Sequence, residues 1–357
     1  MARSKIYLGS TNIGSFFEGA SNVKMFLGEN KVYPLDESFK YKFTLTDSTI
    51  VTGECDATSA VTRNETSAYR SKLVAAEIGN CTTSIGERAL YNCSSLTSIV
   101  IPNSVTSIGK SAFDYCRSLT SCTIGTGLTT IGETAFSLCS NITSIDIPNS
   151  VTSIGDGAFQ YCSSLTSVNI PSGVTSIGKN TFSSCKVLAS IDIPNNVTSI
   201  GERAFYNCSG LTSVNIPSGV TSIGNSAFWG CSGLTSIDIP SGVTSIGSGV
   251  FGLCRSLSAI TIPSGVTSIG SQTFQSCSSL TSIDIPSDVT SIGNYAFADC
   301  SGLTSITVNA VTPPTLDYVS ALENTNNCPI YVPSASVNAY KTATNWSTYA
   351  SRIQAIP

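Results

Sequence analysis

The tripeptide Ser/Thr-Ile-Gly recurs ten times at an unbroken spacing of 23 residues, from Gly86 to Gly293. A phenylalanine, a cysteine and an Ile-Pro pair recur around it at the same spacing. A period of about 20–29 residues with a Leu-x-x-Leu-x-Leu core is typical of solenoids in which each coil holds one strand and one tight turn. Each coil of a solenoid packs only on its neighbours, so the repeat predicts an elongated molecule that presents a surface to a partner.

One unit shows the physical basis of this prediction. The alternation over 168–170 predicts a strand with one buried face, and Pro171 ends it because proline cannot donate to a strand ladder. Gly178 closes a second short apolar alternation, where we expect a positive φ. We expect one helical turn over 181–185, with its Phe and Cys on one face. The same pattern places eleven strands, which start at Leu73, Leu96, Leu119, Ile142, Leu165, Leu188, Leu211, Leu234, Leu257, Leu280 and Leu303.

The segments Leu-x-x-Ile-x-Ile-Pro, Val-x-x-Ile-Gly and Ala-Phe-x-x-Cys together resemble the BspA-like, or Treponema-type, leucine-rich repeats of bacterial surface proteins. The resemblance covers about 73–325 and implies an α/β leucine-rich repeat solenoid with a parallel sheet. It also implies an adhesin or a scaffold that binds protein or glycan, with no catalytic residues and no cofactor. The chain departs from the repeat pattern at Leu90, Cys122, Gly125, Thr181, Val250 and Thr273.

Charged residues make up only 11% of the chain and are concentrated before the repeats. The array is therefore a nearly neutral Ser/Thr surface without the clustered Lys and Arg that nucleic acids require. No apolar run reaches the roughly 18 residues of a membrane span, and the first residues lack the apolar stretch of a signal peptide.

Fourteen cysteines raise the question of a disulfide framework. Ten of them occupy one position of the repeat, where stacked side chains would point in parallel and bridge poorly. We expect these ten to be buried free thiols, and such a reduced interior fits assembly in a bacterial cytoplasm. The chain has no histidine and no Cys-x-x-Cys pair, which argues against a zinc site and against most acid–base catalysis. The other four, Cys55, Cys81, Cys122 and Cys328, share no spacing.

One position of the predicted strands faces the open side of the sheet and carries polar residues. Aspartates occupy alternate repeats there, which reduces repulsion between neighbours roughly 4.8 Å apart. This row is either a solvated ladder or a polar groove for a sugar or peptide. Calcium binding is disfavoured, because successive aspartates would lie about 10 Å apart. The candidate ligand residues are Asp146, Asn169, Asp192, Asn215, Asp238 and Asp284.

Residues 1–34 stand outside the repeats and contain a doubled strand-forming element with glycine turns. They predict a small β-rich anchoring module, and they resemble N-terminal segments of appendage proteins of phages that infect gut bacteria. The candidate anchoring residues are Tyr7, Leu8, Phe26, Leu27 and Tyr33.

Two further segments should close the solenoid. Within 35–72 we expect a hairpin around 46–48 and a short helix over 64–72 capped by Asn64, and this helix would cover the open edge of the first strand. Within 326–357 we expect a strand at 330–332 and then a helix that forms a C-terminal cap. One stripe of that helix would carry Val337, Tyr340, Trp346, Tyr349 and Ile353 as cap core.

These observations leave two non-enzymatic functions. In the first, the chain is a phage virion appendage assembled in the bacterial cytoplasm. Residues 1–34 dock on other virion proteins, with or without homo-oligomerisation, and the solenoid at 73–325 binds host-surface protein or glycan. The alternative is a BspA-like adhesin at the bacterial cell surface. Nucleic acid is not an expected partner of either.

Overall fold

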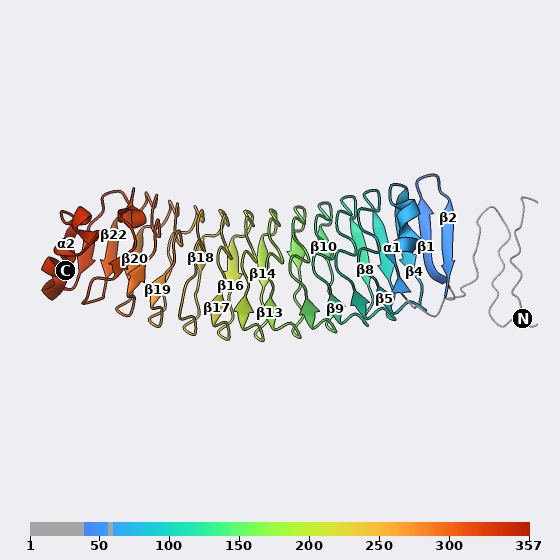
Figure 1. Ribbon diagram of the computed structural model, residues 1–357, viewed down its shortest axis with the longest axis horizontal. Helices are drawn as coiled ribbons and strands as arrows, with labels where there is room; N and C mark the ends of the chain where they lie inside the picture. Colours follow the sequence, from blue (N-terminus) through green and yellow to red (C-terminus); the bar gives the residue numbers. More distant parts are fainter. Residues whose placement is uncertain (1–38, 56–59) are drawn as a thin grey trace, which may run out of the picture.

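The computed structural model describes residues 39–55 and 60–357, which form one elongated solenoid (Figure 1). A β-hairpin lies at one end and short helices lie at the other (Figure 1). The predicted parallel-sheet solenoid of 23-residue units is confirmed. The candidate anchoring residues Tyr7, Leu8, Phe26, Leu27 and Tyr33 lie outside the described residues.

The predicted strands run along one side of the rod as a parallel ladder that is divided into four hydrogen-bonded sheets. Most of them begin two residues after the expected Leu or Ile, which is itself buried. Neighbours pair in register across one repeat, as in Ile191 with Val214. The coil that starts at Leu257 differs from the prediction, because it makes only an isolated bridge between Ser236 and Ala259. The ladder strands are β4 (Leu73–Ile78), β6 (Ser98–Ile101), β8 (Ser121–Ile124), β10 (Ser144–Ile145), β12 (Ser167–Val168), β14 (Ser190–Asp192), β16 (Ser213–Asn215), β18 (Ser236–Ile237), β20 (Ser282–Ile285), β22 (Ser305–Val308) and β24 (Ile330–Val332).

A second parallel ladder, divided into three hydrogen-bonded sheets, runs along the rod at the Ser-Ile that precedes each repeat glycine. Its isoleucines are mostly buried, so the two ladders enclose one continuous core. The members are β3 (Ala60–Val61), β5 (Ser84–Ile85), β7 (Ser107–Ile108), β9 (Thr130–Ile131), β11 (Ser153–Ile154), β13 (Ser176–Ile177), β15 (Ser199–Ile200), β17 (Ser222–Ile223), β19 (Ser268–Ile269), β21 (Ser291–Ile292) and β23 (Thr315–Leu316).

The third side of each coil is a series of tight turns, so the predicted helical turn is wrong. Alternate amides close turns within the coil, as when Ala204 N donates to Gly201 O at 3.3 Å. The amides between them bond the next coil, as when Phe205 N donates to Ala227 O at 2.8 Å. An α-helix would use all these amides internally and leave neighbouring coils unpaired.

The repeat glycine is required for close packing and not for a positive φ. A Cβ on Gly201 would lie 2.8 Å from the carbonyl carbon of Gly178 and 2.8 Å from the amide nitrogen of Lys179. The positive φ falls two residues later, at 53° on Arg203 and at corresponding positions of the other coils. Glycine therefore sets how closely the coils stack.

The phenylalanine column lies at the centre of the core, as predicted. All nine rings, from Phe113 to Phe297, are fully buried. Neighbouring rings stack with centroids 4.9–5.8 Å apart and planes within 15° of parallel. Aromatic stacking of this kind adds to the stability from area burial alone.

The ten repeat cysteines are free and buried, as predicted. Each from Cys116 onward also donates its S–H to a carbonyl of the preceding coil, as Cys208 Sγ does to Phe182 O at 3.0 Å. The thiol therefore satisfies a backbone acceptor in the core as well as filling space.

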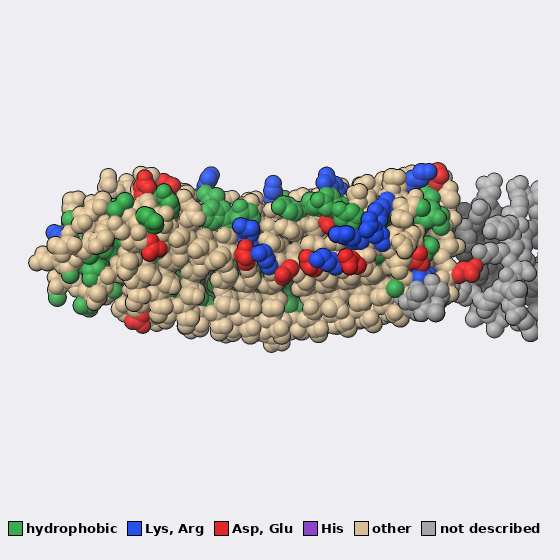
Figure 2. Space-filling model, in the orientation of Figure 1, with side chains coloured by type: hydrophobic (Ala, Val, Ile, Leu, Met, Phe, Trp, Pro, Cys, Tyr) green, Lys and Arg blue, Asp and Glu red, His purple; other side chains and the backbone are tan. Residues whose placement is uncertain are grey.

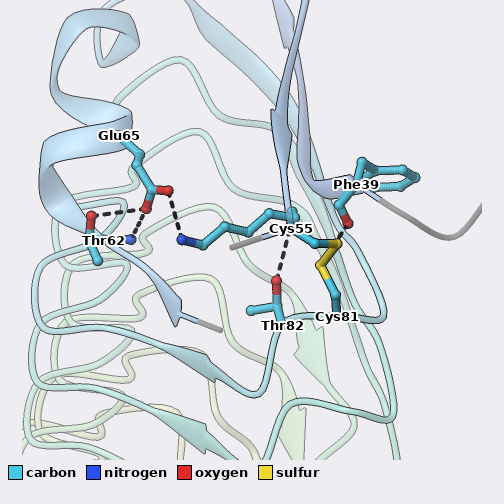
Figure 3. Close-up of polar contacts among 7 residues, drawn as sticks. Phe39, Cys55, Thr62, Glu65, Cys81 and Thr82 are labelled. Carbon is cyan, nitrogen blue, oxygen red and sulfur yellow. Dashed lines mark hydrogen bonds and ion pairs between the residues drawn. A yellow bond between two sulfur atoms is a disulfide. The ribbon is translucent and has the colours of Figure 1, made fainter. Parts of the chain in front are cut away.

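The N-terminal cap contains the predicted hairpin of β1 (Phe39–Leu45) and β2 (Ile50–Glu54). Strand β1 covers the edge of β4 in antiparallel register. The buried ammonium group of Lys40 lies 2.9 Å from the carboxylate of Glu65 (Figure 3). Glu65 also accepts hydrogen bonds from the backbone amide of Thr62, at 2.6 Å, and from its hydroxyl, at 2.9 Å (Figure 3). Thr62, and not the predicted Asn64, is therefore the N-cap of α1 (Arg63–Thr66), which is followed by the 3-10 turn η1 (Ser67–Tyr69).

A disulfide joins Cys55, after the hairpin, to Cys81, in the first coil (Figure 3). Their Cα atoms lie 6.0 Å apart. The expectation of free thiols concerned the ten repeat cysteines, and no bridge between Cys55 and Cys81 was predicted. With this disulfide present, cytoplasmic assembly loses the support of a fully reduced protein.

The C-terminal cap is more broken than predicted. Strand β24 is followed by η3 (Ser334–Ser336), α2 (Val337–Thr342), η4 (Trp346–Tyr349) and β25 (Ile353–Ala355), with η2 (Val319–Leu322) before them. One continuous helical stripe is therefore wrong, because Ala343 is extended and Asn345 has a φ of 64°. The expected core role holds for Tyr340, Trp346 and Ile353, which are buried. The polar atoms of Tyr340 and Trp346 donate to backbone carbonyls, each at 2.7 Å.

Candidate functional site

The predicted ladder face is exposed to solvent at each of its six candidate residues. Strand pairing sets Asp192 directly beside Asn215. Asn169 differs from the others, since its amide donates to Ile147 O at 2.8 Å and accepts from Ile147 N at 3.1 Å. Both polar atoms of the Asn169 side-chain amide therefore bond the backbone of the preceding coil.

The ladder face is hollowed beside the coil that starts at Leu257. This coil forms no strand of the ladder, and a depression of about 370 Å³ lies there, near Thr261, Asp284 and Asn309. The structure thus brings one predicted residue, Asp284, into a concave site. The other five do not line this depression.

A second surface, which the sequence analysis did not identify, lies along the turn side of the rod. Figure 2 shows that charged and apolar side chains gather in one band of the rod, whereas the band below it consists mainly of other side chains and backbone. We call one depression here, of about 260 Å³, the Tyr161 hollow. It is lined by Arg117, Leu138, Ser140, Tyr161, Ser163, Ser184 and Lys186.

Large side chains in this band occupy a backbone conformation that disfavours them. Leu138 and Tyr161 have φ of 57° and 60°. At the same position some coils carry residues that tolerate a left-handed backbone, such as Asn92, Asn207 and Gly230, whereas Tyr115 and Leu253 are large as well. Tyr161 is 45% exposed. The fold therefore accepts strain of about 1 kcal/mol or more at each of the large residues.

Two lysines of the array are paired with carboxylates, whereas the cations of the hollow, like Arg88 and Arg255, have no such partner in the described part of the chain. Lys110 and Lys179 each form an ion pair with a glutamate one coil further on, at 2.7 and 2.9 Å. Arg117 and Lys186 are exposed and form no ion pair with any residue of 39–55 or 60–357. Arg117 lies over the ring of Tyr115, with 5.5 Å from its guanidinium carbon to the ring centroid. The hollow thus lies between two unneutralised positive charges.

The thiols of the core are unsuited to nucleophilic chemistry. Burial raises the pKa of Cys162 and Cys208 to about 12, so both stay protonated at neutral pH. Within the described part of the chain no cluster of His, Cys, Asp and Glu could hold a metal ion. In the same part no helix has the length and apolar character needed to cross a membrane.

A signal for the hollow is present in the sequence. The position eight residues after the repeat glycine is serine in seven coils, and it is Arg117, Lys186 and Arg255 in the other three. This signal lies in a difference between the repeats, whereas the core positions are the ones that the repeats share.

Comparison with known proteins identifies the family. The model of the BspA type leucine rich repeat region matches residues 64–189 and 175–304, more than half of the chain. The chain belongs to this family. No match was found among curated protein sequences.

Solved structures show the same fold. A leucine-rich repeat protein from Bacteroides ovatus is 27% identical, with 82% of this chain and 86% of that chain covered and a TM-score of 0.54. A leucine rich cell surface protein from Faecalibacterium prausnitzii is 30% identical, with 77% and 87% covered and a TM-score of 0.46. The pneumococcal vaccine antigen PcpA is 20% identical, with 77% and 70% covered and a TM-score of 0.55, and it is similar in fold alone.

Proposed function

We propose that this BspA-type protein is a non-enzymatic scaffold that acts outside the cytoplasm, as an adhesin that contacts host-surface protein or glycan. The observation that carries the proposal is the Cys55–Cys81 disulfide in the cap of a BspA-type solenoid. Disulfides form and persist in oxidising compartments and are rare in the cytosol. Bacterial surface proteins with this repeat are exported to such a compartment.

The form of the rod supports a binding role. Its coils repeat the same surface positions at a spacing of roughly 4.8 Å, so an extended ligand can meet several equivalent sites. Weak contacts at each site add up when many copies act on one surface. The ladder residues Asp146, Asp192, Asp238 and Asp284 are one face proposed for such contacts, with Asn169 and Asn215 between them.

Residues 1–34 are proposed as the anchor that leaves the solenoid free to bind. In the adhesin they would face the cell envelope, and in a virion they would dock on other virion proteins. The virion hypothesis rests on these residues, which lie outside the described part of the chain, and the disulfide favours the adhesin. The proposed units are therefore an anchor at 1–34, a cap at 35–72, the solenoid at 73–325 and a second cap at 326–357.

A binding experiment tests the proposal. The purified full-length protein, with its disulfide intact, is applied to arrays of extracellular host proteins and of glycans. In parallel, a deletion strain is compared with its parent for attachment to host cells. We expect array binding and reduced attachment of the deletion strain. Full attachment of the deletion strain, with no array binding by the protein, would contradict an adhesin role.

A further inference from the structure

We propose that the Tyr161 hollow binds an acidic saccharide, whose negative groups reach Arg117 and Lys186 while a sugar ring lies against Tyr161. This inference rests on the proposed binding function and assigns it a site and a ligand class. It begins from the charges: two exposed cations without an acidic partner in the described structure flank one depression in a chain of net charge −4. Fixed positive charge on an otherwise nearly neutral array favours an anionic ligand.

The spacing of the site suits a ligand of several units. Arg117 and Lys186 are 69 residues apart, which is three coils, or roughly 14 Å along the rod. Leu138 and Tyr161 project from the two coils between them. Both cations have long flexible stems, so a ligand of about three coils in length can be held at both ends. The exposed tyrosine ring between them offers an apolar face with a polar tip, which suits a sugar ring.

The hydroxyls in the hollow match a polyol. Ser140 Oγ donates to Arg117 O at 3.5 Å, and Ser163 Oγ donates to Ser140 O at 3.4 Å. Each hydroxyl therefore uses its proton within the rod and leaves its oxygen to accept a hydrogen bond from outside. The cations supply only donors, so the hollow offers donors and acceptors side by side, as sugar hydroxyls require.

An acidic peptide fits the hollow less well. Peptides are usually held by pairing with a strand edge or by an apolar groove. Here the backbone amides of the turns are already used between coils, as when Tyr161 N donates to Ser183 O at 2.8 Å and Leu138 N donates to Gln160 O at 2.8 Å. A peptide backbone would therefore find no main-chain donor at these two residues.

The row that contains the cations provides matched variants. Arg117→Ser and Lys186→Ser each install the residue that seven coils already have at this position, so the fold is preserved. Tyr161→Asn installs the residue of the coil that holds Asn207, which tolerates the left-handed backbone. The control is Arg255→Ser, which changes a cation at the same position of another coil. The coils between Lys186 and Arg255 carry Asn207 and Gly230 in place of Leu138 and Tyr161, so the apolar side chains of the hollow have no counterpart there.

The experiment measures binding of the full-length protein to trigalacturonate, to a sulfated trisaccharide, to neutral galactotriose and to poly-glutamate. We expect binding of one or both acidic sugars that weakens with added salt, and little binding of galactotriose or poly-glutamate. Arg117→Ser and Lys186→Ser should each weaken acidic-sugar binding by several-fold, because each removes one charged contact at a solvent-exposed position. Tyr161→Asn should weaken it several-fold, and Arg255→Ser should leave it unchanged.

Three results would overturn the inference. These are no binding of either acidic sugar, equal or tighter binding of poly-glutamate, and loss of binding in Arg255→Ser to the same extent as in Lys186→Ser. Each of them leaves the proposed function standing if the host arrays still show binding elsewhere. If neither the arrays nor the acidic sugars bind, both the proposed function and this site fail.

Discussion

Gly201→Ala should destabilise the solenoid by forcing two coils apart. The added Cβ would lie 2.8 Å from two backbone atoms of the preceding coil, whereas ordinary contact begins at 3.4 Å. Relief requires a shift of about 0.6 Å, and backbone atoms cannot rotate away as a side chain can. The substitution therefore acts on the stacking distance of the whole coil.

The cost follows from the hydrogen bonds that this shift would stretch. Gly201 N donates to Ile177 O at 2.8 Å, Phe182 N to Ala204 O at 2.9 Å and Thr198 N to Thr175 O at 3.0 Å. Weakening these three bonds, at about 1 kcal/mol each, gives a loss of about 3 kcal/mol, within the range of about 1–3 kcal/mol typical of overpacking.

Urea unfolding followed by circular dichroism measures this effect, with Gly219→Ala as the control. A Cβ on Gly219 would meet its nearest atoms at 3.4 and 3.6 Å, in ordinary contact, so the midpoint should change little. Gly201→Asn separates close approach from backbone conformation, since Asn tolerates a positive φ. It should be at least as damaging as Gly201→Ala. A stable Gly201→Asn, or equal midpoints for the Gly201→Ala and Gly219→Ala variants, would refute the packing argument.

Three further predictions concern the core and the cap. Phe205→Ala should lower the free energy of unfolding by about 3–5 kcal/mol in urea titrations, because the ring is fully buried between two stacked neighbours. Phe205→Leu should lower it much less, because Leu90 occupies the same position of its own coil. Similar losses for the two variants would contradict this prediction. Burial raises the pKa of Cys162 to about 12, above its ordinary value of 9.0, so the folded state keeps a proton that the unfolded chain loses. The free energy of unfolding should therefore fall between pH 9 and 12, by about 1 kcal/mol for each such thiol by pH 10. Urea midpoints that stay constant over this range would refute thiol burial. Reduction of the Cys55–Cys81 disulfide should make the N-terminal cap unfold more readily than the central coils, so amide hydrogen exchange should become faster in β1 and β2 than in those coils. Uniform exchange along the rod would show that the disulfide does not hold the cap.

The repeat made most of the solenoid predictable. The apolar alternation located the strands, and the fixed phenylalanine and cysteine located the core, because each repeats an environment that every coil shares. The reason given for the repeat glycine was wrong, since Gly201 is limited by the neighbouring coil, and one coil alone cannot show that contact. The helical turn failed for the same reason, because half of its amides bond the next coil.

The ends and the binding surface were less predictable. The Cys55–Cys81 bridge joins residues of different elements, and their sequence spacing of 26 carries no signal for pairing. The C-terminal stripe was assigned to one helix because Tyr340, Trp346 and Ile353 are spaced as on a helix, yet they reach the same core from a helix, a 3-10 turn and a strand. The Tyr161 hollow depends on departures from the repeat, which stand out only once the coils are superposed on the fold.

The central claim, that this BspA-type solenoid acts outside the cytoplasm, is tested most directly in the producing cells. Intact cells are labelled with a membrane-impermeant reagent, and the protein is then recovered, denatured and alkylated without reduction. The account predicts surface-labelled protein in which two of the 14 cysteines, Cys55 and Cys81, resist alkylation. Unlabelled protein in the cytosolic fraction, with all its cysteines alkylated, would contradict the account.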